Sequence, residues 1–212
     1  RIESPLKIRL RGSRFGPDTF ADVDAAPGAC KSRLLVYAGG AISPAEYLAR
    51  RDTSPTELLS VLRPAGASYS VLVLPYSPAL PGRPEDAAEL LVGHFHDELL
   101  PALPLRPERM AILGSSRGAA SAVLLARAVG GRVGRLATLG AVGAAEALAL
   151  ERPCLVSLSG MARVAWNTGD PCAPHSERFA GALEAAGIGH DVARGEGGHG
   201  FREYVANGLL SR

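Results

Sequence analysis

The pentapeptide Gly-Ser-Ser-Arg-Gly at residues 114–118 is the part of the sequence best suited to covalent chemistry. It matches the pattern Gly-x-Ser-x-Gly, with an apolar strand-like run before it and a helical pattern after it, which is the context this motif requires. A serine on such a sharp turn needs small residues two positions to either side, and the turn lifts its hydroxyl above the sheet. The flanks of Ser115 do not fit the pattern, so we predict Ser116 as a nucleophile.

A base must activate this serine, because a hydroxyl is a weak nucleophile until its proton is removed. His199 lies among glycines, after the last expected strand and before the last expected helix, where a loop would reach the sheet edge that carries Ser116. His175 at a helix start and His190 at a strand start are the alternatives, and both fit surface or structural roles better. We therefore predict His199 as the base, in agreement with the chain order serine, acid, histidine.

An acid must orient that base, and the carboxylate between the serine and the histidine in the chain order is the natural candidate. Asp170 ends the strand-like run at 164–170 and precedes a proline. Glu177 on a helix and Asp191 inside a strand compete with it, and a plain turn aspartate is the structural alternative. We predict Asp170 as the acid.

Two backbone N–H groups are needed to hold the oxyanion that forms when a nucleophile attacks an acyl carbon. One is expected from Arg117, directly after the nucleophile, and the other from the glycine-rich loop after an early strand. Gly40 is the preferred donor in that loop and Ala41 the second choice. Gly39, Ala41 and Ser115 are expected to contact the substrate.

Apolar runs alternate with helical patterns along the chain. Runs that are apolar throughout are typical of parallel strands that are buried on both faces. We therefore predict a single α/β domain over residues 1–212 with three layers: a mostly parallel sheet with helices on both faces, little or no cap, and antiparallel strands as an option in the first 30 residues. The expected strands are 34–37, 71–74, 110–113, 136–139 and 191–194, and 155–158 and 164–166 are two further apolar pieces of the same pattern. One helix is expected to begin at 54, and the others are expected at 84–100, 119–129, 176–186 and 201–210.

Three stretches, at 95–101, 107–118 and 197–204, resemble the α/β-hydrolase superfamily, and within it the esterase D and enterochelin-esterase-like group. The likeness extends over roughly residues 33 to 210. It implies an α/β-hydrolase domain and a cofactor-free Ser-Asp-His triad. Gly200 and Phe201 stand where the group usually has aspartate and tryptophan, and Ala38-Gly39 replaces its common His-Gly pair.

The composition excludes several classes of protein. A chain of 212 residues that is 47% hydrophobic has the apolar content of a folded domain, and a net charge of +2 without basic runs does not favour nucleic acid or an anionic membrane. No apolar run is long enough for a membrane helix, and the N-terminus does not read as a signal peptide, so the cytoplasm is the default location. A removed export signal is the alternative.

Cysteine and histidine spacing predicts no metal site and no disulfide framework. Cys30, Cys154 and Cys172 are expected to be buried free thiols, with a bridge between Cys154 and Cys172 as the alternative. His94 and His96 are two positions apart on an expected helix and therefore point to different faces.

The residues together predict a serine esterase or thioesterase that acts through an acyl-enzyme on a small-molecule or carrier-bound acyl substrate. An acyltransferase or cyclising thioesterase with the same triad is the nearest alternative. A non-catalytic binding domain on this scaffold is another. A cofactor-binding domain with a nucleotide at the 114–118 turn is the third, although the glycine patterns of nucleotide-binding loops are absent.

Overall fold

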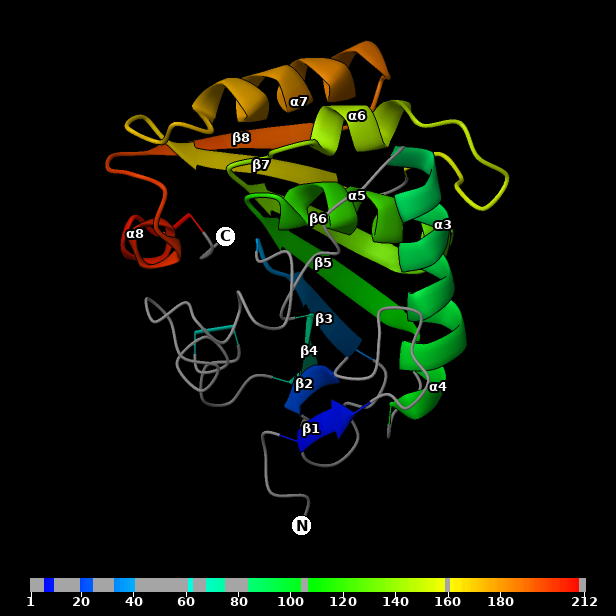
Figure 1. The fold of residues 1–212 in the computed structure, drawn as a ribbon. Helices are drawn as coiled ribbons and strands as arrows, with labels where there is room; N and C mark the ends of the chain where they lie inside the picture. Colours follow the sequence, from blue (N-terminus) through cyan, green and yellow to red (C-terminus); the bar gives the residue numbers. More distant parts are fainter. Residues whose placement is uncertain are drawn as a thin grey trace.

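A computed structural model describes residues 6–9, 20–24, 33–40, 61–62, 68–74, 84–103, 107–158 and 161–209. Its strands form an eight-stranded sheet in the order β1-β2-β4-β3-β5-β6-β7-β8 (Figure 1). The pairs β1-β2 and β2-β4 are antiparallel, and every other pair is parallel. The strands are β1 Leu6–Arg9, β2 Phe20–Asp24, β3 Arg33–Ala38, β4 Ser70–Leu74, β5 Arg109–Ser115, β6 Val133–Leu139, β7 Met161–Asn167 and β8 His190–Gly195.

Helices cover both faces of this sheet, with α3, α5, α6 and α7 on one side and α8 on the other (Figure 1). A short turn of 3-10 helix, η3, follows α5 directly, and a π-helical segment, η2, separates α3 from α4. The bounds are α3 Pro84–Gly93, η2 His94–Leu99, α4 Leu100–Ala102, α5 Gly118–Val129, η3 Gly130–Arg132, α6 Ala144–Ala149, α7 Ala173–Ala185 and α8 Phe201–Ala206.

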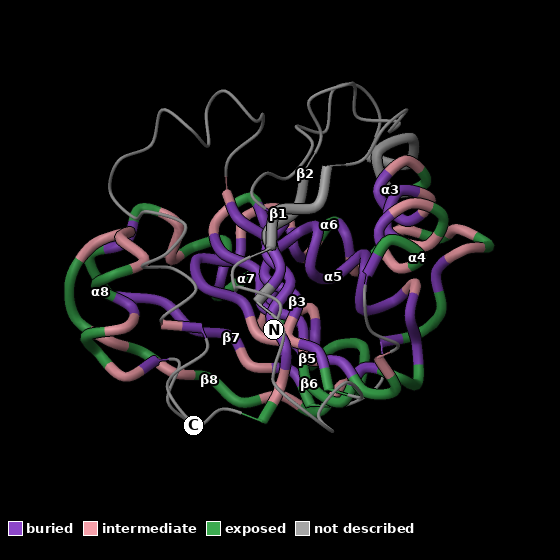
Figure 2. The backbone as a smooth tube through the Cα atoms, turned by 90° about the horizontal axis from the view of Figure 1, so that it is seen from below, coloured by how far each residue is buried: buried purple, intermediate pink, exposed green. Residues whose placement is uncertain are grey.

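The central strands are buried on both faces because their side chains alternate between two cores. Ile112 of β5 packs in the core under α5 and α7, whereas its neighbour Leu113 packs in the core that also contains Tyr204 of α8. Buried residues concentrate in α5 and the central strands (Figure 2). The predicted three-layer architecture with a mostly parallel sheet is thereby confirmed, and the first two strands are the antiparallel ones.

The expected helix at 84–100 differs in its middle, because η2 is wider than an α-helix. His94 lies there with only 5% of its surface exposed, and its Nδ1 is 2.6 Å from Glu98 Oε2. This contact gives His94 a carboxylate partner within its own helix. No metal-ligand cluster in the described part of the chain includes His94 or His96.

Several expected features lie outside the described residues: the start of the helix expected at 54, Ala41 and Cys30. Within the described part, Cys154 and Cys172 are free thiols, but both are half-buried and not buried as predicted. None of the described helices has the length and apolar character needed to cross a membrane.

Candidate active site

Ser116 occupies a strained turn between β5 and α5. Its φ of 54° is the only positive φ of a non-glycine residue among the described residues. A Cβ at Gly118 would lie 2.1 Å from the carbonyl oxygen of Ala38, and one at Gly114 would lie 2.6 Å from the carbonyl oxygen of Gly118. Both flanking glycines are therefore required for the backbone to pack this closely, and the strain concentrates on the residue between them.

Asp170 and His199 come together at the same edge of the sheet, in the loops that follow the neighbouring strands β7 and β8. His199 Nδ1 lies 2.8 Å from Asp170 Oδ1. The aspartate side chain has no exposed surface, whereas 29% of the imidazole is exposed. Because Asp170 accepts the Nδ1 proton, the tautomer inferred from this bond leaves Nε2 as the basic nitrogen.

Three donors satisfy the buried carboxylate of Asp170. Besides His199, the backbone N–H of Cys172 donates to Oδ1 at 2.6 Å, and the hydroxyl of Tyr204 donates to Oδ2. Burial alone would raise the pKa of Asp170, but these hydrogen bonds and the nearby His199 together hold the pKa below its usual range. The carboxylate therefore stays ionised beside the imidazole.

Tyr204 is the site residue that sequence reasoning missed. It is completely buried on α8, and its hydroxyl oxygen also lies 3.1 Å from His199 Nδ1. Burial and the neighbouring Asp170 raise the pKa of Tyr204, so the phenol remains a proton donor. The sequence offers one clue to this role: Tyr204 lies about one helical turn into the helix expected after His199.

The loop that carries His199 is tied to its surroundings by side-chain amides. Asn167, fully buried at the end of β7, donates to the carbonyl oxygen of Gly198 at 2.9 Å and accepts a 2.8 Å bond from Asn207. Glu203 of α8 accepts a hydrogen bond from the Gly198 N–H. The loop that contains His199 is therefore hydrogen-bonded to the end of β7 and to α8, and these bonds fix the position of the imidazole.

Gly40 lies against the Ser116 side chain from the loop after β3. A Cβ at Gly40 would be 2.9 Å from Ser116 Cβ and 3.4 Å from its Oγ. The Arg117 Nε donates to the Gly40 carbonyl oxygen at 3.1 Å, which fixes this peptide relative to the turn. Among the backbone hydrogen bonds of the described residues, none has the Gly40 N–H as its donor. This placement suits an oxyanion donor.

The remaining residues expected near the substrate are less accessible. Gly39 is buried, and its N–H donates to the Leu74 carbonyl oxygen at 3.2 Å, so the fold already uses that donor. Ser115 is also buried, at the end of β5.

Gly140 joins the Ser116 turn to the Asp170–His199 pair. The Ser116 N–H donates to the carbonyl oxygen of Leu139 at 2.8 Å, and Gly140 follows with φ of 59°. A Cβ there would lie 2.8 Å from His199 Cε1 and 3.0 Å from Asp170 Oδ2. Among the interactions of the described residues, no hydrogen bond joins Ser116 Oγ to His199, a contact that often tightens only when substrate binds.

The competing residues lie elsewhere. His175 and Glu177 are exposed on α7, His190 begins β8, and Asp191 pairs with Arg163 across 3.3 Å. None of them forms a hydrogen bond with Ser116, Asp170 or His199 among the described interactions.

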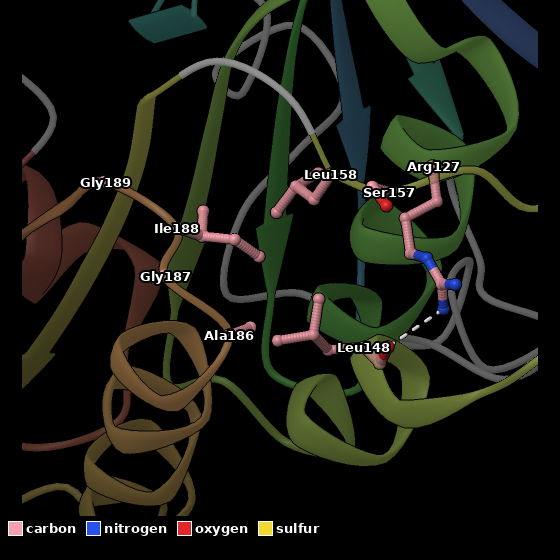
Figure 3. A pocket seen from close by; sticks show the side chains of 8 residues that line it. All are labelled: Arg127, Leu148, Ser157, Leu158, Ala186, Gly187, Ile188 and Gly189. Carbon is pink, nitrogen blue, oxygen red and sulfur yellow. Dashed lines mark hydrogen bonds between the residues drawn. The ribbon is translucent and has the colours of Figure 1, made fainter.

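A cavity of about 450 Å³ lies at the opposite edge of the sheet, where β7 and β8 begin (Figure 3). Its only charged lining residue, Arg127, donates to the carbonyl oxygens of Ala147, Leu148, Leu150 and Val156 and thereby ties α5 to the segment around α6. These four hydrogen bonds give Arg127 a structural role. The lining residues are Arg127, Leu148, Ser157, Leu158, Ala186, Gly187, Ile188 and Gly189.

No protein-family model matches the chain, and no curated protein matches it. Solved structures do match over nearly its whole length. A ferulic acid esterase has a TM-score of 0.64 and 11% identity, covering 97% of this chain and 94% of that one. An S-formylglutathione hydrolase from Staphylococcus aureus has a TM-score of 0.61 and 15% identity, covering 98% and 95%.

An enterochelin esterase from Shigella flexneri has a TM-score of 0.64 and 14% identity, covering 98% of this chain and 56% of that one. At such low identities the likeness concerns the fold. The predicted fold is confirmed by these matches and by the sheet order. The chain has the α/β-hydrolase fold.

Proposed function

We propose that the protein is a serine hydrolase that cleaves an ester or thioester through an acyl-enzyme. The observation that carries the proposal is the hydrogen bond between the buried Asp170 carboxylate and the partly exposed His199, at the sheet edge where Ser116 lies on its strained turn. These are the residue types, chain order and placement that hydrolysis by an activated serine requires. The structural neighbours named as esterases and hydrolases support the same reaction class.

In the proposed reaction, Ser116 Oγ attacks the acyl carbon while His199 Nε2 takes its proton. Asp170 holds the ring through Nδ1 and stabilises the imidazolium that forms. The N–H groups of Gly40 and Arg117 hold the oxyanion. His199 then protonates the leaving alcohol or thiol, and a water activated by the same nitrogen releases the acid.

A panel of chromogenic esters and thioesters with acyl chains of increasing length tests this proposal. Rapid mixing at high enzyme concentration is expected to show a burst of leaving group that matches the enzyme concentration, because an acyl-enzyme accumulates when its hydrolysis is slower than its formation. A folded preparation that cleaves no member of the panel faster than buffer would favour the non-catalytic binding domain.

Gly140→Ala is expected to damage activity more than stability. The added Cβ collides with His199 and Tyr204, and displacing a reacting group by about 1 Å costs roughly 100-fold in rate. Gly143→Ala is the matched control, since its φ of 72° imposes similar backbone strain while its Cβ would meet only Ala120, at 3.2 Å. The measurements are kcat/KM and urea unfolding of both variants. Equal activity in the two would contradict the proposed role of this loop.

Tyr204→Phe is expected to cost about 1–3 kcal/mol of stability at neutral pH, because it leaves a buried carboxylate oxygen without its donor. The pKa of Asp170 is depressed in the fold, so its ionised form stabilises the protein above the ordinary carboxyl range. That contribution is lost as the pH falls through the folded-state pKa. The stability gap between wild type and variant should therefore narrow in acid.

Urea unfolding at neutral pH and at a series of acid pH values that extends well below the ordinary pKa of aspartate measures this gap. Tyr69→Phe is the control, because the Tyr69 hydroxyl donates to the neutral carbonyl of Leu62 at 2.7 Å. Its stability cost should change little with pH. A Tyr204→Phe gap that is as large in acid as at neutral pH would argue that the Asp170 charge is not what Tyr204 stabilises.

A further inference from the structure

The thiol of Cys172 faces the nitrogen of His199 that the proposed reaction needs. Cys172 Sγ lies 3.9 Å from His199 Nε2, although the two residues are far apart in the sequence. Cys172 is half-buried as a residue, and 29% of the imidazole surface of His199 is exposed. Asp170, Cys172 and His199 form the one cluster of potential metal ligands found among the described residues.

The separation of the two atoms fits a shared metal ion. With Zn–S near 2.3 Å and Zn–N near 2.0–2.1 Å, tetrahedral coordination places sulfur and nitrogen about 3.6 Å apart. The observed 3.9 Å needs a shift of only a few tenths of an ångström. We propose that Cys172 Sγ and His199 Nε2 form a binding site for a thiophilic divalent cation such as Zn²⁺, and that the bound ion inhibits the enzyme.

Asp170 supports such a site without being a ligand. Its Oδ1 already accepts the His199 Nδ1–H and the Cys172 N–H, and its Oδ2 accepts the Tyr204 hydroxyl. A histidine whose second nitrogen donates to a carboxylate is the usual arrangement at protein metal sites, because the carboxylate fixes the tautomer and makes the ligand more basic. Water completes the coordination of the ion.

Binding removes the base from the reaction. Cys172 loses its proton to solvent when sulfur coordinates the ion, and the Nε2 lone pair forms the second bond. That lone pair is then unable to accept the Ser116 proton. The inhibition rests on the proposed hydrolase function, whereas the binding itself does not. Soft ligands of this kind discriminate against Mg²⁺ and Ca²⁺, which prefer oxygen.

Cobalt absorption tests the binding without any substrate. Co²⁺ titrated into the wild type should produce the near-ultraviolet charge-transfer band of a cobalt–thiolate bond, and added Zn²⁺ should displace it. Cys172→Ala keeps the backbone N–H that Asp170 accepts and should abolish the band. Cys154→Ala, which removes the other half-buried thiol of the described residues, should retain it. A band of equal strength in Cys172→Ala would overturn the site.

Titration of activity tests the inhibition. Zn²⁺ should inhibit the wild type and Cys154→Ala reversibly, with recovery on addition of a chelator, while Mg²⁺ and Ca²⁺ have no effect. In Cys172→Ala the Zn²⁺ concentration for half-inhibition should rise at least about tenfold, the smallest loss seen when even an outer partner is removed from a metal site. Zn²⁺ bound through Cys172 with activity unchanged would overturn the inhibitory role.

The two arms separate this inference from the proposed function. A wild type that shows the cobalt–thiolate band but hydrolyses no ester would retain the metal site and contradict the hydrolase. A wild type that hydrolyses esters but shows no band would contradict the metal site alone.

Discussion

Replacing Ser116 by alanine is expected to lower kcat/KM for an activated ester by at least about ten-thousand-fold, the range of loss known for serine hydrolases without their nucleophile. Alanine removes the oxygen that would form the acyl-enzyme and changes nothing else of comparable size. Both residues carry a Cβ, so the strain of the positive φ is the same in each. Steady-state hydrolysis by the variant measures the loss of activity, and urea unfolding checks that its stability is unchanged.

Ser115→Ala is the control for this experiment, because Ser115 is adjacent in sequence but belongs to β5 and is buried. It is expected to remain acylated by substrate in the burst assay. A Ser116→Ala protein that keeps the burst would place the nucleophile elsewhere.

Asp170→Asn is expected to lower kcat by about ten-thousand-fold, the loss known for the equivalent change in a serine protease triad. The amide is nearly the same size as the carboxylate, but it carries no charge to stabilise the imidazolium. It also offers an N–H where His199 Nδ1 or Tyr204 now finds an acceptor. The wrong histidine tautomer is therefore favoured, with Nε2 protonated and unable to act as a base.

Asp191→Asn and Glu177→Gln are the matched controls, since each removes one carboxylate that competes with Asp170 on sequence grounds. Asp191 pairs with Arg163 away from the site, and Glu177 is exposed on α7. Both variants are expected to keep a kcat close to that of the wild type, because neither carboxylate forms a hydrogen bond with Ser116, Asp170 or His199 among the described interactions. An Asp170→Asn enzyme that is equally active would exclude Asp170 as the acid.

The Ser116 turn could be predicted because its cause is local. The close approach of α5 to β3 requires glycine at 118, and the close approach of α5 to β5 requires glycine at 114; both residues are visible in the sequence as the motif itself. The parallel sheet was predictable for a similar reason, since apolar runs such as 110–113 leave no polar face for solvent. Asp170 and His199 meet because successive parallel strands deliver their following loops to one edge.

The other contacts of the site could not be predicted, because they depend on tertiary packing that leaves no local sequence pattern. Tyr204 reaches Asp170 only because α8 lies across the second face of the sheet, and a buried tyrosine there looks in sequence like an ordinary core aromatic. The proximity of Cys172 to His199 arises from two separate loops, so the spacing rules for metal ligands miss it. The π-helical segment η2 likewise has the apolar periodicity of an α-helix.

Covalent labelling with a fluorophosphonate, followed by peptide mass spectrometry, tests the central claim most directly. Such probes react with a serine that an adjacent base has activated, so the proposed site predicts one adduct per chain, on Ser116. The adduct should be absent in Ser116→Ala and strongly slowed in Asp170→Asn. An adduct on any other residue, or unchanged labelling of Ser116→Ala, would contradict the assignment of Ser116 as the nucleophile.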